Sequence, residues 1–464
     1  MYTFARAIAA WLALLAGGAA LAAPPSPAGA SKQIVVAFTN QPQALPSSAG
    51  STGTRYSGGG GYTVAQSAQR QARRVASDYA LREVVSWPIQ VLSMHCVVFE
   101  ITNGRPAADV LAALAHDRRV ALAQPLQEFH TLTEPAAPAA IAPAATAPAA
   151  TAAAATAAAA PAAASSPATS ATAAATPTAK DAAPYNDPLY DLQTNLTTLG
   201  IARAHERTQG AGVHIALIDT AVDANHPDLH GRIAHAQSFV ETQASPGTSL
   251  RHGTAVAGVI AAVANNHVGI VGIAPLAQLE VFAGCWQLAP DSDAAACNTF
   301  TLARALAAAL ASGAPLVNLS LAGPADPLLE ALVQAGLRRG ITFVGAAAGT
   351  EAPFPTAIPG VITASGTEQS PRSALLAPAQ HVLTLRPGGE YDFESGSSVA
   401  AAEVTGVIAL LMSASPTRLT PSAITSLLGA AEQPPPAVRA IDVNAALARL
   451  DAGAGGAVAA RAAH

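Results

Sequence analysis

Three residues far apart in the chain carry the chemical groups that nucleophilic acyl transfer requires. Asp219 ends the apolar run "VHIALID", His252 stands directly before "GTAVAGVIAAV", and Ser398 stands at the start of another long apolar run. A serine is a weak nucleophile until a histidine takes its proton, and an aspartate fixes the tautomer of that histidine and stabilises its cation. Singly, each is an ordinary residue at the end of an element. Together they indicate a catalytic Asp-His-Ser triad.

The segment "SGSSVAAAEVTGVIALL", residues 395–411, leaves open which serine is the nucleophile. Its apolar residues recur near the helical period, so the sequence predicts a helix that begins close to Ser398. Backbone N–H groups and the dipole at such a helix start favour developing negative charge. Gly396 allows the tight turn that exposes a hydroxyl. We assign the nucleophile to Ser398. Ser397 is the alternative, but it would move the reactive group off the helix start.

The elements that must position these residues alternate between strands and helices from about residue 184 to residue 450. Apolar strands alternating with helices indicate an α/β fold, doubly wound around a mostly parallel sheet. In such folds the site lies at the carboxyl ends of the strands, which is where Asp219 stands. The predicted strands are residues 213–219, 279–283, 315–321, 341–348 and 361–366, and the predicted helices are 253–264, 299–312, 327–339, the helix at Ser398, and 421–432.

A smaller unit, about residues 31–132, precedes a low-complexity stretch. Its predicted order is strand, helix, strand, strand, helix, strand, which suggests a small α+β ferredoxin-like sandwich. Residues 134–183 are almost entirely Ala, Pro, Thr and Ser, with no large side chain to bury, and this composition indicates a semi-extended linker between two domains. The six predicted elements of the small unit are residues 33–38, 65–81, 89–94, 95–101, 106–117 and 120–125.

The first residues and the cysteines indicate export, with a secreted or periplasmic product. Residues 1–22 combine an early positive charge, a short apolar stretch and small residues, as a secretory signal peptide does, with a membrane anchor as the alternative. Cys285 and Cys297 lie close together in the sequence. In an oxidising compartment we expect a disulfide between them, with two free thiols as the alternative. Cys96 would then be unpaired.

Composition argues against several classes of partner. Only 11% of the residues are charged and the net charge is −5, which gives no electrostatic case for nucleic acid or an acidic membrane surface. Alanine inflates the hydrophobic content of 51%, and no segment after the signal peptide looks long and apolar enough to span a membrane. We expect a monomer without a membrane span after signal removal, and a flexible tail at residues 451–464.

These motifs resemble those of the subtilases, peptidase family S8. "IALIDTAVDANHPDL" is similar to the family's aspartate motif, "RHGTAVAGVIAA" to its histidine motif and residues 395–411 to its serine motif, in the Asp, His, Ser order of subtilisin. The resemblance implies that residues 31–132 are a propeptide that acts as an intramolecular inhibitor, whose tail "VALAQPLQEFHTL" occupies the active site until it is cut. It also implies that an extended substrate pairs with "VNLSLAG" through Ser320, Leu321, Ala322 and Gly323.

One residue departs from the family pattern at a position that bears on rate. "FVGAAAGT" is similar to a family segment that ends in asparagine, whose amide donates to the oxyanion, and here that position is Thr350. No asparagine occurs between residues 319 and 443, so no small shift of the alignment restores one. Loss of such a donor costs on the order of 10²–10³ in rate in subtilisin, the worked case of this effect. A threonine hydroxyl can donate one hydrogen bond. Glu403 also stands where the family has a histidine.

The sequence specifies no cofactor and predicts a secreted serine endopeptidase, made as a zymogen, that acts on polypeptides. Calcium often stabilises this family, but no carboxylate-rich loop specifies it, and His226 with Asp223 and Asp228 is not a convincing metal site. The alternative is a catalytically impaired subtilase homologue that binds peptides without cutting them. Thr350 favours that alternative, and the three intact motifs oppose it. A structural envelope protein with an Ala/Pro stalk would explain the linker but not the motifs.

Overall fold

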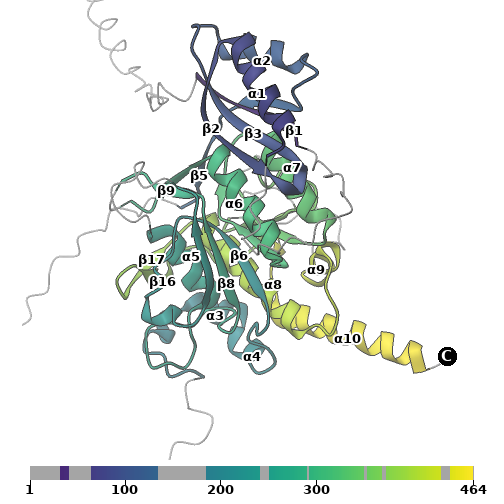
Figure 1. Ribbon diagram of the computed structural model, residues 1–464. Coiled ribbons are helices and arrows are strands. Elements are labelled where there is room, and N and C mark those ends of the chain that lie inside the picture. The colour runs from purple at the N-terminus through teal and green to yellow at the C-terminus, as the bar shows by residue number, and fades with distance from the viewer. Residues whose placement is uncertain are drawn as a thin grey trace, which may run out of the picture. The chain divides into compact units, whose positions relative to one another are not determined.

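The structure is a computed structural model (Figure 1) and describes residues 32–40, 64–133, 184–240, 250–289, 292–349, 353–367, 373–429 and 439–462. These residues form two compact units. The first contains residues 32–40, Val64–Trp87 and His95–Leu126, and the second contains Pro88–Met94 and the described residues from Gln127 onward. The predicted signal peptide, the Ala/Pro linker and Thr350 lie outside the described residues.

The first unit has the predicted βαββαβ order, with two helices and a four-stranded sheet of order β2-β3-β1-β4. Strand β1 pairs with β4 in antiparallel register, Ile34 opposite Pro125. Alternate residues of β1 and β3 pack in one core with an apolar stripe from each helix, and the residues between them in both strands are also largely buried. The elements are β1 (Gln33–Thr39), α1 (Gln66–Tyr79), β2 (Leu81–Ile89), β3 (Met94–Ile101), α2 (Ala107–Ala115) and β4 (Leu122–Pro125).

The second strand of this unit was predicted wrongly at residues 89–94. In the structure β2 covers Leu81–Ile89, and Gln90–Leu92 form a short 3-10 turn. Strand β2 lies at the edge of the sheet, and most of its residues from Arg82 to Ser86 are exposed. Its sequence therefore lacks the apolar pattern on which the prediction depended.

The second unit is built on a parallel sheet of order β18-β15-β14-β13-β11-β6-β8-β7, and every pairing within it is parallel. The predicted doubly wound α/β class is confirmed. The central strands are buried along their whole length, as expected for a sheet covered on both faces. The strands are β6 (His214–Asp219), β7 (Ile233–Ser238), β8 (Gln278–Ala283), β11 (Leu316–Leu319), β13 (Thr342–Ala346), β14 (Ile362–Ser365), β15 (Leu375–Leu376) and β18 (Arg439–Ala440).

The helices of this unit pack in two groups, α5 with α8 and α6 with α7. Helix α6 begins with a capping box between Asn298 and Thr301, and α7 begins with Pro327 after the capping carboxylate of Asp326. These caps explain why the sequence located both helix starts well. The helices and 3-10 turns are η3 (Tyr190–Leu192), α3 (Thr194–Leu199), α4 (Ile201–His205), η4 (Pro227–Leu229), α5 (Arg251–Ala261), α6 (Thr299–Ser312), α7 (Pro327–Arg338), α8 (Ser397–Ala414), α9 (Pro421–Leu427) and α10 (Val443–Ala462).

Two smaller sheets complete the second unit. One has the order β12-β5-β10-β9, and the other is an antiparallel hairpin of β16 and β17. The strands of these sheets are only two to five residues long, too short for a hydrophobic period to be recognised, so the sequence did not predict the hairpin. The strands are β5 (Glu128–Thr131), β9 (Cys285–Gln287), β10 (Ala295–Asn298), β12 (Leu321–Ala322), β16 (Val382–Arg386) and β17 (Glu390–Glu394).

Two helices differ from what the sequence led us to expect. Helix α8 is, by length and composition alone, long and apolar enough to cross a membrane, but 78% of it is buried inside the unit, as in the core helix of a packed domain. Helix α10 continues to Ala462, whereas a flexible tail was expected from residue 451. Alanine has the highest helix propensity, and the alanine-rich sequence here continues the helix.

Candidate active site

A buried aspartate–histidine pair joins the end of β6 to the start of α5. Asp219 is the last residue of β6 and is 1% exposed, and His252, in the first turn of α5, is 3% exposed. His252 Nδ1 lies 2.6 Å from Asp219 Oδ1. Because a carboxylate can only accept, the proton of this hydrogen bond belongs to Nδ1. The Nε2 lone pair of His252 is then available to take a proton from another group.

The local sequence holds this helix start close to the end of the strand. Gly253 N–H donates to Thr220 Oγ1 at 2.8 Å, and Thr220 N–H donates to Asp219 Oδ1 at 2.6 Å. A Cβ at position 253 would lie 2.7 Å from the carbonyl oxygens of both Thr220 and Ala221. Only glycine therefore allows the approach that brings the imidazole of His252 to the carboxylate.

Ser398 lies in the first turn of α8 and is 1% exposed. The residue that caps the helix, Gly396, has a φ of 130°, a conformation that favours glycine. Ser320 Oγ donates to the Ser398 carbonyl at 3.1 Å and accepts from Asn318 Nδ2 at 2.8 Å. Asn318 Oδ1 in turn accepts from Thr405 Oγ1 at 2.8 Å. This buried chain of hydrogen bonds fixes α8, and with it Ser398, to the end of β11.

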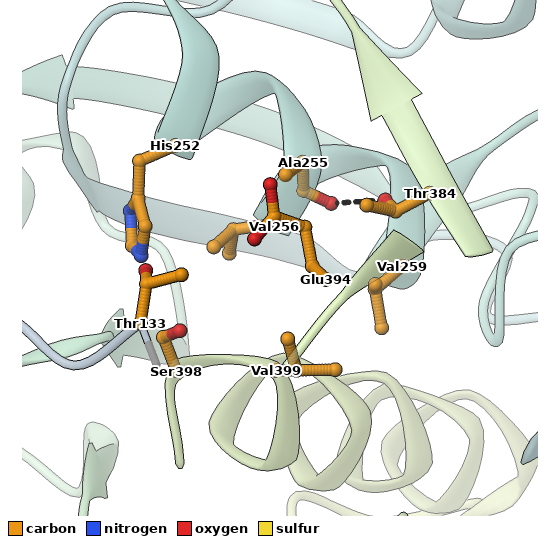
Figure 2. A pocket seen from close by; sticks show the side chains of 9 residues that line it. All are labelled: Thr133, His252, Ala255, Val256, Val259, Thr384, Glu394, Ser398 and Val399. Carbon is orange, nitrogen blue, oxygen red and sulfur yellow. Dashed lines mark hydrogen bonds between the residues drawn. The ribbon is translucent and has the colours of Figure 1, made fainter. Parts of the chain in front are cut away.

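His252 and Ser398 line one pocket, which we call the Ser398 pocket (Figure 2). In this view the His252 ring points toward Thr133 and Ser398. Ser397 does not line the pocket, so the structure favours Ser398 over the alternative serine. Among the described residues, the buried Nε2 of His252 and the buried hydroxyl of Thr133 have no hydrogen-bond partner. The full lining is Thr133, His252, Ala255, Val256, Val259, Thr384, Glu394, Ser398 and Val399.

The charges around His252 favour its protonated form. Burial alone lowers the pKa of His252, but the charge and hydrogen bond of Asp219, together with the charges of Glu394 and Asp293, outweigh it and raise the pKa above its ordinary value. A histidine that stabilises a proton in this way is suited to accept one from a hydroxyl during a reaction.

A segment from before the Ala/Pro linker pairs as a strand with the residues predicted to bind substrate. Strand β5 is antiparallel to β12, with Thr131 opposite Leu321 and His130 opposite Ala322. Leu132 N–H donates to the carbonyl of Ser320 at 3.4 Å, which continues the pairing by one residue. On its other side β5 is antiparallel to β10. An extended peptide therefore lies between two strand edges, as in recognition by strand addition.

The strand ends with a carbonyl directed at the start of α8. Ser398 N–H donates to the carbonyl oxygen of Leu132 at 3.2 Å. The next residue, Thr133, lines the Ser398 pocket. The peptide bond between Leu132 and Thr133 therefore lies at the residues predicted for catalysis, with its carbonyl polarised by the backbone of the candidate nucleophile.

One side chain of β5 is buried in an aromatic site. Phe129 is 0% exposed, and its ring centroid lies 5.4 Å from that of Phe354 in an edge-to-face arrangement. Gly323 forms the floor of this site, since a Cβ there would lie 2.2 Å from Phe129 Cδ1. The backbone of Gly323 pairs with Phe354 rather than with β5. Of the four residues predicted to bind substrate, Ser320, Leu321 and Ala322 pair through the backbone with residues 130–132, that is, with β5 and Leu132. Gly323 has no side chain and so leaves the space that the Phe129 ring fills.

A disulfide joins Cys285 in β9 to Cys297 in β10. Cys297 lies opposite Phe129 in the β10–β5 register. The cross-link is therefore part of one edge that holds the tail strand. Cys96, in the first unit, is a buried free thiol, and burial raises its pKa far above the ordinary value.

Residues 210–455, more than half of the chain, match the subtilase family (peptidase S8). The chain belongs to the subtilase family. Thermitase from Thermoactinomyces vulgaris is 31% identical over 244 residues, which are 49% of this chain and 85% of thermitase. Subtilisin E from Bacillus subtilis (strain 168) is 33% identical over 230 residues, 45% of this chain and 57% of that protein. The family prediction is confirmed, and with it the class of enzyme, a serine endopeptidase and hydrolase.

A solved structure supports the same fold. Fervidolysin from Fervidobacterium pennivorans, described as a keratinolytic enzyme related to subtilisin, gives a TM-score of 0.59 over 90% of this chain and 60% of its own. At 18% identity this likeness concerns the fold alone.

Two further sequence expectations were an oxyanion donor at Thr350 and the absence of a convincing metal site. Thr350 lies outside the described residues, so its role as an oxyanion donor stays a prediction. Within the described part of the subtilase, no group of three or more His, Cys, Asp or Glu side chains could hold a metal ion. His226 Nδ1 accepts from Asp228 N–H at 3.1 Å, and Asp228 Oδ2 accepts from Ile270 N–H at 2.8 Å. Both side chains are used in local hydrogen bonds.

Sequence reasoning missed two features of the site, one peptide bond and one buried acid. It gave the tail as a segment and did not single out the bond between Leu132 and Thr133, although the abrupt change to Ala/Pro composition directly after Thr133 marks that point. It also passed over Glu394, a buried acid in the pocket wall. Glu394 directly precedes "SGSS", but it ends the acidic run "EYDFE" with Glu390 and Asp392, so no sequence pattern indicated that this acid alone is buried.

Proposed function

We propose that this subtilase is a secreted serine endopeptidase made as a zymogen, with Ser398 as nucleophile, His252 as general base and Asp219 as the residue that orients the histidine. The observation that carries the proposal is the hydrogen bond from Ser398 N–H to the carbonyl of Leu132. It supports the assignment of the Leu132–Thr133 peptide as the first bond that the enzyme cuts.

The reaction follows from these positions. Ser398 Oγ attacks the carbonyl carbon of Leu132 while His252 Nε2 takes the hydroxyl proton. Ser398 N–H, already bonded to that oxygen, stabilises the negative charge that develops on it. His252 then gives the proton to the leaving nitrogen of Thr133, and water hydrolyses the ester between Leu132 and Ser398. The scheme needs no cofactor and no second copy of the chain.

The tail also supports a substrate preference for the mature enzyme. After release of the tail, β12 and β10 would offer the same two edges to another extended polypeptide. We propose that good substrates have an apolar residue such as leucine before the cut bond and a large aromatic residue in the site between Gly323 and Phe354. The buried Phe129 supports the second preference.

Maturation and export complete the proposal. The signal-peptide character of residues 1–22 supports secretion. Residues 31–132 would inhibit the enzyme through their tail until the bond after Leu132 is cut. The long Ala/Pro linker that follows Thr133 would let the new N-terminus leave the pocket and provides sites for later trimming.

Thr350 is proposed as the second oxyanion donor. Its hydroxyl has one proton to donate, whereas the asparagine usual in the family offers an amide with two. If Thr350 contributes, Thr350→Ala should lower kcat by up to about 10²-fold, and Thr350→Asn should restore or raise it. An unchanged kcat in both variants would show that Thr350 does not reach the oxyanion.

The test of the proposed function is fluorophosphonate labelling of the protein made from the full chain, with Ser398→Ala beside it. Labelling of a shortened wild-type form and absence of labelling in Ser398→Ala would support an activated Ser398. If the folded protein stays unlabelled even after another protease removes the tail, the peptide-binding alternative replaces the enzyme.

A further inference from the structure

Glu394 is a buried acid in the wall of the Ser398 pocket. It is the last residue of β17 and only 8% exposed, and it lines the pocket together with His252 and Ser398. Figure 2 shows its side chain reaching toward α5 near Ala255 and Val256. The reaction scheme above gives this carboxyl no task, and no part of the triad chemistry requires a second acid.

The positive charge nearest to Glu394 is shared with other acids. Arg386 Nη2 lies 3.9 Å from Glu394 Oε1, but only 2.6 Å from Asp392 Oδ2 and 3.7 Å from Asp293 Oδ2. Asp293 is also paired with Arg251 Nε at 2.8 Å. The arginines are thus largely committed to the two aspartates, and among the described residues Glu394 has this one long ion pair.

Glu394 and His252 act on each other's charge. Burial first, then the charges of Asp293 and Asp392, raise the pKa of Glu394 to about 7, while His252 and Arg251 oppose the rise. In the other direction, the charge of Glu394 is one of the causes that raise the pKa of His252. The charge of each group therefore shifts the pKa of the other, so proton uptake by Glu394 and by His252 is coupled.

We propose that Glu394 is a positioning residue that acts through His252, as a second carboxylate whose ionisation makes the histidine harder to deprotonate and so sets the pH range of the enzyme. The charged groups that face Glu394 are His252 and Arg251 on α5, Arg386 on β16, Asp392 on its own strand, and Asp293. The proposal rests on the proposed role of His252 as general base.

The coupling predicts a particular pH profile. At high pH the ionised Glu394 holds the proton on His252. As the pH falls, protonation of Glu394 weakens this hold, so the histidine gains its proton over a wider pH range than a single independent group would. The acid limb of activity in the wild type is therefore shallower than one-proton behaviour. Without the carboxylate, the limb becomes a one-proton limb and moves to lower pH, because the remaining charges favour the cation less.

The experiment measures the second-order rate of fluorophosphonate inactivation against pH, between about pH 5 and pH 9, for protein made from the full chain and matured. The variants are Glu394→Gln, which is nearly isosteric, and Glu390→Gln, the same change at an exposed position of the same strand. For Glu394→Gln we expect a lower midpoint and a steeper acid limb. At about pH 6 its rate relative to its own maximum should exceed the wild-type fraction by roughly two- to tenfold. Glu390→Gln should match the wild type.

The outcomes separate this proposal from the proposed function. A wild type labelled at Ser398 with an ordinary one-proton acid limb would overturn the role of Glu394 and leave the protease intact, even if Glu394→Gln failed to fold. An unchanged limb in folded Glu394→Gln, or an equal shift in Glu390→Gln, would overturn it as well. Complete absence of labelling in matured wild type would instead remove the proposed function.

Discussion

The two strands that hold the tail differ in how they are themselves held. Strand β12 follows directly after β11 of the core sheet, and the buried hydrogen bonds of Ser320, Asn318 and Thr405 tie that junction to α8. Strand β10 belongs to a short sheet outside the core sheet, and a disulfide joins it to its neighbour β9. One edge of the proposed substrate groove is fixed by the same packing that positions Ser398, and the other by a covalent link.

Because the two edges are held differently, substitutions at β12 and at β10 should have different effects on the reaction. A change at β12 also disturbs the adjacent Ser320, whose hydroxyl donates to the carbonyl of Ser398, so it should affect the chemical step. A change at β10 should affect how tightly the peptide is held, with less effect on the step itself. The two edges can therefore be told apart by kcat and KM.

The largest effect is expected from closing the aromatic site on the β12 side. Gly323→Val would place side-chain atoms where the Phe129 ring lies, and a misplaced peptide of this kind can lose about 10² in rate. Self-cleavage after Leu132, followed by mass spectrometry over time, measures this loss. The double variant Gly323→Val with Phe129→Ala is the control, because it restores the space. Normal maturation of Gly323→Val alone would show that the aromatic site is not used.

A smaller effect is expected from loosening the β10 edge. Replacing both Cys285 and Cys297 by serine should lower the free energy of unfolding by about 2–3 kcal/mol and raise KM for a peptide substrate more than it lowers kcat. Denaturant unfolding and steady-state kinetics measure the two effects. A reductant should affect the wild type and leave the double variant unchanged. A fall in kcat of the double variant as large as its rise in KM would contradict the idea that β10 only holds the peptide.

A smaller loss of stability and of kcat is expected from breaking the hydrogen bond between Thr405 and Asn318, beside β12. Thr405→Val keeps the shape of the side chain but leaves the buried Asn318 Oδ1 without its donor, which should cost about 1–3 kcal/mol of stability. We expect kcat to fall with little change in KM, the reverse of the disulfide variant. Thr425→Val, which removes a hydrogen bond within α9, is the control and should leave kcat unchanged.

The smallest expected effect is on the pH dependence of stability and comes from Glu403. This residue is fully buried in α8, and its carboxyl accepts a hydrogen bond from Asn195 Nδ2 at 2.9 Å. Burial raises the pKa of Glu403 well above its ordinary value. The stability that neutral Glu403 contributes is present below its unfolded pKa of about 4.3 and is lost as the pH rises toward the folded value. Glu403→Gln should therefore flatten the decline of stability between about pH 5 and pH 8, by roughly 1 kcal/mol or more. The free energy of unfolding is measured with denaturant at both pH values. If it falls between them by the same amount in Glu403→Gln as in the wild type, a neutral Glu403 is contradicted.

Much of the fold was readable from the sequence because the core strands and helices are long, apolar and well capped. The element starts at Asn298, Asp326 and Ser398 follow from local chemistry. The edge strand β2 and the β16–β17 hairpin were missed, since their residues are largely exposed or pair in short runs.

For the site, the sequence indicated the residue types and their order but not their meeting in space. The 2.6 Å contact of His252 with Asp219 and the position of the Leu132 carbonyl depend on tertiary packing. The burial of Glu394 depends on how the β16–β17 hairpin packs against α5 through β16, which no local pattern encodes.

The most direct test of the account is the position of the first cut. The full wild-type chain and Ser398→Ala are folded, incubated and analysed by intact mass and N-terminal sequencing. The account predicts a wild-type fragment that begins at Thr133 and an uncut Ser398→Ala chain. Cleavage at Thr133 in both chains, or a folded wild type that is cut only elsewhere, would contradict the claim that Ser398 attacks the carbonyl of Leu132.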